Sequence, residues 1–152
     1  MSHIFKFGLL LFLTIYCCNS INGQPYNIEF KLEISERNAQ SLTSCAKWMI
    51  SLRDENGTVL DQEAFPFRER KQICPIQVSN YGVYTAYFFL DLNNNGKLDQ
   101  GVFGQPKEPY AFSNNARNYF GKPSITSQKF NFFNKDVEIY VLLNYHFTGL
   151  YD

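Results

Sequence analysis

Oxygen-bearing side chains alternate in the stretch 91–99, which reads DLNNNGKLD. Asp91, Asn93 and Asn95 stand at its first, third and fifth positions, and a glycine follows at the sixth. Calcium binds six to eight oxygen atoms, and a tight turn at a glycine lets alternate side chains and a carbonyl converge on one point. The spacing therefore predicts a calcium site. Its predicted ligands are Asp91, Asn93, Asn95, the carbonyl group of Lys97, Asp99 and, from later in the chain, Glu108, with Asn114 or Asn115 as alternatives to Glu108.

A second interpretation of the same residues needs no metal. The twelfth position of the stretch is Val102, where an EF-hand loop has a bidentate glutamate, and the preceding residues 84–90 have the pattern of a strand instead of a helix. Asp and Asn side chains also accept hydrogen bonds from the backbone two residues on, and Gly96 supplies a positive φ. On this interpretation the stretch is an Asx-rich turn that holds itself together.

The carboxylates suggest one further chemistry. Glycan hydrolases use a pair of carboxyl groups as acid and base, and Asp91, Asp99 and Glu108 could supply such a pair. Other catalytic arrangements are poorly supported, because His146 is the only histidine after residue 3. A zinc site of two or three histidines is thereby excluded, and we expect His146 to be an ordinary partly exposed residue. No phosphate-binding glycine loop or dinucleotide fingerprint occurs.

Short strands must position these side chains. Apolar and polar residues alternate in YNIEFKLEI and AKWMISL, and Asn56-Gly57 is typical of a hairpin turn. Pro66 and Pro75 indicate edge strands. The sequence predicts an all-β fold, an antiparallel Greek-key-like β-sandwich of about seven strands with one long ordered loop. The predicted strands are 26–34, 46–52, 59–67, 73–79, 83–91, 127–133 and 136–145.

The long loop covers residues 91–123, more than a compact domain usually leaves without regular structure. Its prolines and aromatic residues indicate that it packs on itself, and Ser113 is expected to cap one helical turn at 114–117. Aromatic side chains can also form a platform for sugars. The predicted loop face consists of Tyr110, Phe112, Asn114, Asn115 and Tyr119.

The N-terminus indicates export. Lys6 precedes the apolar run 7–16 and a polar segment ending at Gly23, which is the layout of a secretory signal peptide and too short to span a bilayer. We therefore predict a signal peptide at 1–23, one β-sandwich domain at 24–152, and a secreted or periplasmic protein. A lipid anchor at Cys17 or Cys18 is the alternative.

Export also bears on the two remaining cysteines. Thiols in a small exported domain usually pair, so we predict a disulfide between Cys45 and Cys74; two separately buried thiols are the alternative. The sequon at Asn56 matters only in a host that glycosylates exported proteins. With 14 basic and 14 acidic residues the chain has no net charge, which argues against a nucleic-acid partner.

Five segments resemble a family of exported, mostly bacterial proteins known as domain-of-unknown-function family 2141. The similarity runs from about residue 27 to 145 and is sharpest in the long loop, with Ala111 where the family has a glycine and an additional residue at Thr85-Ala86. The segments are 82–86, 91–99, 104–108, 112–115 and 121–123. The resemblance implies a small exported β-sandwich and no known reaction.

Together these features predict a non-enzymatic exported module, associated with binding or with the cell envelope, whose functional face is the long loop. The expected partner is an extracellular or envelope protein or a glycan, with no nucleic acid and no transmembrane segment after signal cleavage. Calcium is the only cofactor that the sequence suggests. The alternative function is a small secreted glycan hydrolase that uses Asp91, Asp99 and Glu108.

Overall fold

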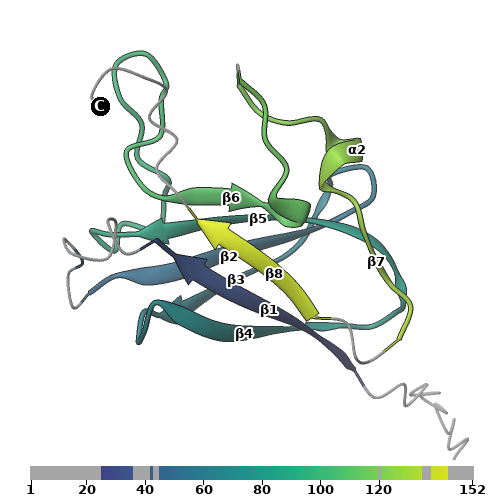
Figure 1. The fold of residues 1–152 in the computed structure, drawn as a ribbon. Coiled ribbons are helices and arrows are strands. Elements are labelled where there is room, and N and C mark those ends of the chain that lie inside the picture. Colours follow the sequence, from purple (N-terminus) through teal and green to yellow (C-terminus); the bar gives the residue numbers. More distant parts are fainter. Residues whose placement is uncertain (1–24, 36–41, 43–44, 120, 135–137, 144–152) are drawn as a thin grey trace, which may run out of the picture.

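The chain folds into two β-sheets packed face to face (Figure 1). This computed structural model describes residues 25–35, 42, 45–119, 121–134 and 138–143. The predicted signal peptide and His146 lie outside these residues. Within them strands are the main regular structure, and the one α-helix, α2 (Ile125–Gln128), has 4 residues. The predicted all-β sandwich is confirmed.

The first sheet has three strands in the order β4-β1-β8. Strand β1 (Tyr26–Ile34) lies in the middle, antiparallel to β4 (Lys71–Val78) and parallel to β8 (Glu138–Leu143). The parallel pair departs from the predicted antiparallel pattern. Hairpin neighbours must be antiparallel, but β1 and β8 come from opposite ends of the described chain, so no hairpin fixes their relative direction.

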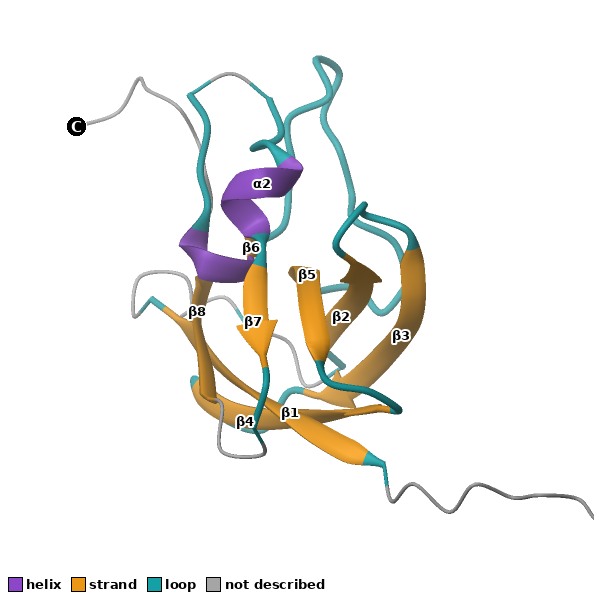
Figure 2. Cartoon of the chain, turned by 90° about the vertical axis from the view of Figure 1, so that its right-hand side faces the viewer, coloured by secondary structure: helices purple, strands orange, loops and turns teal. Residues whose placement is uncertain are grey.

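The second sheet is built on strand β5 (Gly82–Asp91). On one side β5 pairs with β2 (Lys47–Asp54), which in turn pairs with the edge strand β3 (Val59–Pro66). On its other side β5 pairs with two short strands in succession. These are β6 (Tyr110–Phe112) at one end and β7 (Phe130–Phe132), which follows α2 directly in Figure 2, at the other.

Both proline predictions are confirmed. Pro66 ends β3 and Pro75 lies in β4, and each of these strands is at the edge of its sheet. The predicted hairpin between β2 and β3 is also present: Asp54 Oδ1 accepts hydrogen bonds from the backbone N–H groups of Asn56 (2.9 Å) and Thr58 (2.8 Å). Because these bonds favour the ionised form, they lower the pKa of Asp54.

The core lies between the sheets and is rich in aromatic side chains. Phe30 of β1 meets Phe88 of β5 edge to face, with ring centroids 5.0 Å apart. Trp48 is fully buried, and its indole N–H donates to Gln72 Oε1 at 3.2 Å, so its polar atom is satisfied. Phe132 brings β7 into the same core.

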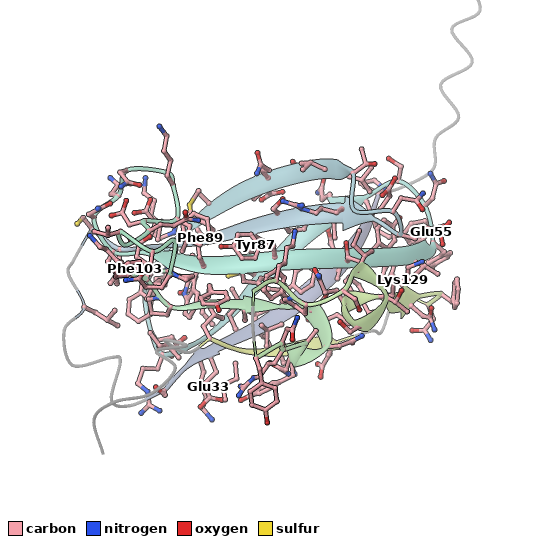
Figure 3. The ribbon with its side chains drawn as sticks, turned by 90° about the horizontal axis from the view of Figure 1, so that it is seen from above. Glu33, Glu55, Tyr87, Phe89, Phe103 and Lys129 are labelled. Carbon is pink, nitrogen blue, oxygen red and sulfur yellow. The ribbon has the colours of Figure 1, made fainter. Side chains whose placement is uncertain are left out.

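Strand β5 is apolar on both faces, and this explains the long loop. Its residues Tyr84, Ala86, Phe88 and Leu90 face the core. Because side chains alternate along a strand, Tyr87 and Phe89 must face away from it. Figure 3, viewed from above, shows these two side chains next to each other on β5, with Phe103 from the loop near one end. The loop thus covers an outer sheet face that would otherwise expose aromatic rings.

Candidate functional site

The chain leaves β5 through a turn organised by Asp91. This carboxylate is fully buried; its Oδ1 accepts from the backbone N–H of Asn95 at 3.1 Å and its Oδ2 from that of Gly96 at 2.7 Å. Asn94 and Gly96 have φ angles of 60° and 76°. Because these residues are left-handed, successive backbone N–H groups point at the Asp91 carboxylate. Their hydrogen bonds stabilise its negative charge.

A second carboxylate completes the turn from its far end. Asp99 accepts from the side-chain amides of Asn93 (2.7 Å) and Asn95 (3.0 Å). The amide oxygens of the same asparagines accept from backbone N–H groups, that of Asn93 from Asn95 and that of Asn95 from Lys97. Each asparagine therefore links the backbone to Asp99, as the Asx-turn interpretation predicts.

Glu108 fastens the turn to the returning chain. It is 3% exposed and accepts from the backbone N–H groups of Leu92 (2.8 Å) and Asp99 (3.1 Å). The backbone N–H of Lys107 donates to the Asp99 carbonyl at 2.8 Å. Burial raises the pKa of Glu108, the two backbone hydrogen bonds lower it, and the charges of Asp91 and Asp99 raise it further.

The turn was predicted to bind calcium, and the structure gathers the predicted ligands Asp91, Asn93, Asn95, Asp99 and Glu108 in one hydrogen-bonded network. Of Lys97 it shows only that its N–H belongs to this network. Their carboxylate oxygens all accept from N–H groups of the protein. Among the described residues, no group of three or more His, Cys, Asp or Glu side chains is arranged to hold a metal ion.

Beside this turn the loop encloses a groove of about 560 Å³ over the outer face of the second sheet. Its floor consists of Arg53 from β2, Tyr87 from β5, and Tyr110 and Phe112 from β6. Two excursions of the chain, which rise on the same side of the sheet in Figure 1, provide the walls. One wall contains residues from 98–106, and the other contains Asn118, Tyr119, Gly121 and Lys122.

The floor is a continuous aromatic surface. Phe112 pairs with Tyr87 across the β5–β6 ladder, and their ring centroids are 5.1 Å apart. Tyr110 meets Phe112 at 6.0 Å with nearly perpendicular planes, and Tyr87 stacks on Phe89 at 5.9 Å. Burial raises the pKa values of Tyr87 and Tyr110, so both hydroxyl groups stay protonated at neutral pH and can donate hydrogen bonds.

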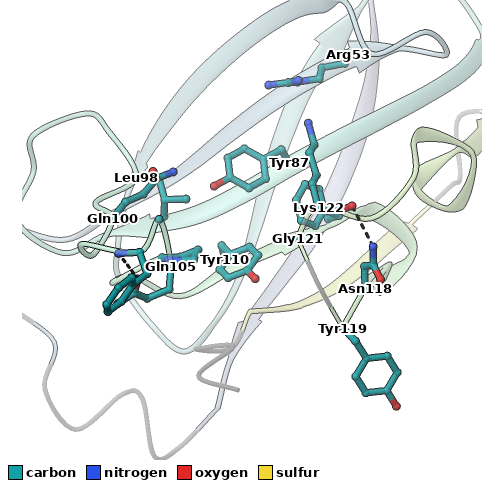
Figure 4. A pocket seen from close by; sticks show the side chains of 14 residues that line it. Arg53, Tyr87, Leu98, Gln100, Gln105, Tyr110, Asn118, Tyr119, Gly121 and Lys122 are labelled. Atoms are coloured by element: carbon teal, nitrogen blue, oxygen red, sulfur yellow. Dashed lines mark hydrogen bonds between the residues drawn. The ribbon is translucent and has the colours of Figure 1, made fainter. Parts of the chain in front are cut away.

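The charged side chains of the groove are both cationic. Figure 4 shows Arg53 and Lys122 at the same end of the groove, next to Tyr87. The Lys122 amino group lies 5.8 Å from the centroid of the Phe112 ring. Burial and the charge of Arg53 lower the pKa of Lys122. Among the residues that the structure describes, no Asp or Glu lines the groove.

The wall of the groove nearest the turn at residues 91–99, called the calcium-like turn here because its spacing resembles a calcium-binding loop, is a small hairpin. The Gly101 N–H donates to the Gln105 carbonyl at 2.7 Å, and Gln100 bridges to Pro106. A Cβ atom at Gly101 would lie 2.3 Å from Nε2 of Gln105, so any side chain here would displace the end of the Gln105 side chain. The hairpin tip is Val102-Phe103, whose side chains are 95% and 92% exposed.

The residues of the predicted loop face lie in two different places. Tyr110, Phe112 and Tyr119 line it, whereas Asn114 and Asn115 do not. Those two asparagines instead connect elements: Asn115 donates from Nδ2 to the Tyr140 carbonyl (3.1 Å) and accepts from the Leu142 N–H (2.8 Å), and Asn114 donates to the carbonyl of Lys129. They tie the loop to β8 and to the start of β7.

Ser113 has a related structural role that differs from the predicted helix cap. It begins the 3₁₀ turn η1 (Ser113–Asn115), which has no side-chain cap. Its buried hydroxyl accepts from the Ala86 N–H at 2.9 Å and donates to the Gln128 carbonyl. Ala86 lies in the gap on β5 between its pairings with β6 and β7, so the hydroxyl replaces a missing strand partner.

The predicted disulfide between Cys45 and Cys74 is absent from the structure. Cys74 is buried in the core from β4, whereas Cys45 is exposed and its thiol donates weakly to the Leu92 carbonyl at 3.7 Å. Burial raises the pKa of Cys74 to about 11. Export alone suggested pairing, but pairing also needs the two side chains to face each other, which the sequence does not encode locally.

Sequence reasoning missed Arg53, Tyr87, Gln105 and Lys122 as groove residues. Tyr87 carried a usable signal, because VYTAYFFLD is apolar at both alternating sets of positions and such a strand needs cover on both faces.

No helix in the described part of the chain is long and apolar enough to cross a membrane.

Known proteins resemble this chain over part of its length. Asparagine–tRNA ligases of Streptococcus agalactiae serotype III and Streptococcus pyogenes serotype M5 are each 32% identical over 76 residues. The aligned part is 49% of this chain but only 17% of each ligase, so the chain matches a small part of these enzymes. No solved structure matches the chain.

A family model gives broader coverage. It matches residues 35–140, more than half of the 152 residues, and includes both the calcium-like turn and every residue that lines the groove. The chain belongs to the family described as an uncharacterized protein conserved in bacteria (DUF2141).

Proposed function

We propose that this protein is an exported, non-enzymatic binding module that holds a glycan of the extracellular space or cell envelope in the groove over its second sheet. The observation that carries the proposal is the groove itself. Its volume of about 560 Å³ lies within the range of ligand sites, roughly 300–1,000 Å³. Its aromatic floor and its polar walls are the usual composition of such sites.

The shape of the floor favours a sugar. Tyr87 and Tyr110 are partly exposed and offer flat apolar surface on which the C–H faces of a pyranose ring can pack, and the buried Phe112 ring supports both of them. Gln100, Gln105 and Asn118 line the same space with amides that can both donate to and accept from hydroxyl groups. A rigid sheet carries the floor, so little ordering would be needed on binding.

A glycan hydrolase is the less supported function. Its candidate carboxylates Asp91, Asp99 and Glu108 accept N–H groups inside the turn and do not line the groove. A catalytic acid and base must reach a scissile bond from two sides of a sugar. The described residues that line the groove include no carboxyl group that could do so.

The proposed location is the periplasm or the cell exterior, with attachment through a lipid at Cys17 or Cys18 as the alternative. The basic residue, apolar run and small residues of the first 23 positions support it. Labelling of the intact cell surface and N-terminal sequencing of the exported protein would test both versions.

Calcium at the turn is a separate proposal. It is supported by the spacing of Asp91, Asn93, Asn95 and Asp99. To bind the ion, Asn93 and Asn95 would have to rotate their amides so that oxygen replaces the nitrogen now facing Asp99. Calcium should then raise the melting temperature and a chelator should reverse it; an unchanged melting temperature would reject the site.

Binding in the groove can be tested with a panel of tetrasaccharides and calorimetric titration. Tyr110→Ala should weaken binding at least about tenfold, because truncating an aromatic anchor commonly costs more than about 1.4 kcal/mol. Tyr140→Ala is the matched control, since Tyr140 is 51% exposed on β8 and does not line the groove. Equal affinity of both variants, or no binding by the wild type, would reject the proposal.

A further inference from the structure

We infer that the groove is specific for acidic sugars, namely oligosaccharides that carry carboxylate groups. This inference rests on the proposed function and adds the charge of the ligand to it. Two cationic side chains, Arg53 and Lys122, line the groove, and none of the described residues that line it is acidic. The chain as a whole is balanced, with 14 basic and 14 acidic residues, so this local excess is a property of the groove.

The two cations lack a carboxylate partner. Arg53 uses Nε to donate to Ser51 Oγ at 3.3 Å, which leaves its terminal guanidinium nitrogens for another acceptor. In the part of the chain that the structure describes, the ion pairs join Lys31 to Glu138, Lys71 to Glu33, and Lys129 to Glu55. Neither groove cation takes part in them. An anion placed between Arg53 and Lys122 would supply the missing counter-charge.

The positive charges of Arg53 and Lys122 also disfavour each other. Partial burial and the charge of Arg53 lower the pKa of Lys122, so the two positive groups repel each other. The carboxylate whose charge acts on Tyr87 of the floor is Glu108, and its two oxygens already accept from the backbone N–H groups of Leu92 and Asp99. Glu108 therefore cannot serve as their partner.

The stacking surface lies directly beside the cations. Lys122 sits over the ring of Phe112, and Phe112 packs against Tyr87. Because Lys122 covers the buried Phe112 ring, the sugar would rest on the partly exposed Tyr87, and an exocyclic carboxylate of that sugar would face Arg53 or Lys122. Arg offers a planar pair of donors that matches a carboxylate, and the tyrosine hydroxyls can bind neighbouring sugar hydroxyls.

A polyphosphate or nucleic acid fits less well. Such ligands are held by rows of Lys and Arg that neutralise successive phosphates, whereas this groove has two cations at one end. An acidic peptide would not use the flat aromatic floor. Carboxylated sugars use both the charge and the aromatic surface.

The test compares acidic tetrasaccharides with uncharged forms of the same chains. Tetragalacturonate and a hyaluronan tetrasaccharide are titrated into the exported protein beside their methyl esters, which keep the sugar rings and remove the charge. We expect each bound acid to bind at least tenfold more tightly than its ester, and the difference to shrink as salt is raised. Arg53→Gln and Lys122→Gln should each abolish most of that difference.

Lys107→Gln is the control, because Lys107 is an exposed lysine of the same loop that does not line the groove. It should keep the full preference for the acid. If esters bind as tightly as acids and Tyr110→Ala still weakens both, the groove binds glycans but the charge inference is wrong. If no tetrasaccharide binds, the proposed function and the inference both fail. Binding of a phosphorylated or peptide probe in preference to the acids would also overturn it.

Discussion

At the scale of single residues, the calcium-like turn depends on backbone conformation as much as on its carboxylates. Gly96 has a φ of 76° and donates its N–H to the buried Asp91. Gly96→Ala should lower the free energy of unfolding by about 1 kcal/mol, because a Cβ atom disfavours the left-handed conformation. Urea denaturation measures the change.

Gly82→Ala is the comparison for this prediction. Gly82 begins β5 without a left-handed φ, and an added Cβ would make ordinary contact with the Tyr84 ring at 3.6 Å. Its substitution should cost clearly less than that of Gly96. Equal costs would show that the conformation of Gly96 does not matter to the turn.

The two cysteines give a second prediction at this scale. Because burial raises the pKa of Cys74 to about 11, its thiol is protonated and shielded at pH 8, whereas Cys45 is exposed. A thiol reagent should label the native protein at Cys45 and the denatured protein at both positions, without a reductant. Failure to label either cysteine after denaturation would establish the disulfide that the sequence predicted.

At the scale of elements, Ser113 holds together a strand edge that is divided between β6 and β7. Its buried hydroxyl serves both the Ala86 N–H and the Gln128 carbonyl. Ser113→Ala should lower the free energy of unfolding by about 2–3 kcal/mol, because two buried polar groups lose their partner. Chemical denaturation compares the variant with the wild type.

Ser79→Ala is the control, since Ser79 is exposed in the turn before β5. It should change stability by less than about 0.5 kcal/mol. A loss for Ser113→Ala as small as that for Ser79→Ala would mean that water replaces the hydroxyl and that the two strands do not need this connection.

The sequence predicts the elements that are set by neighbouring residues better than those set by contacts between residues far apart in the chain. Alternation in residues 26–34 and the Asn56-Gly57 turn are local signals, and β1 and the β2–β3 hairpin appear where they indicate. Strand β6 has only three residues, too few for a visible alternation, and pairs with β5 from across the loop. The roles of Asn114 and Asn115 are likewise set by distant backbone groups of Lys129 and Tyr140.

At the scale of the whole molecule, the two apolar faces of β5 connect the core to the groove. One face closes the sandwich through Phe88, and the other forms the floor through Tyr87. The sequence indicated that the long loop packs through its aromatic side chains, and it named Tyr110 and Phe112 in the predicted loop face. It did not show that Arg53 and Lys122, 69 positions apart in number, would meet over that floor, because only the folded sheet brings them together.

Because the groove joins the sheet to both walls, ligand binding should stabilise the whole native state. A ligand in the groove touches the sheet floor and both walls, so it should stabilise the native state as a unit. At a concentration one hundred times its dissociation constant, a single bound ligand adds about 2.7 kcal/mol to the free energy of unfolding. The melting temperature of the protein with tetragalacturonate should therefore rise by several degrees.

Hydrogen exchange can locate this stabilisation. Backbone amides of the wall at 98–106 and of β6 should exchange more slowly when ligand is bound. The ligand holds these segments to the floor and so suppresses the local unfolding through which they exchange. Amides of β4, at the edge of the other sheet, should change little under the same conditions. Tyr110→Ala should reduce both the thermal shift and the local protection at the same ligand concentration. A ligand that bound and protected β4 instead would place the site on the opposite face and contradict the groove as the functional surface.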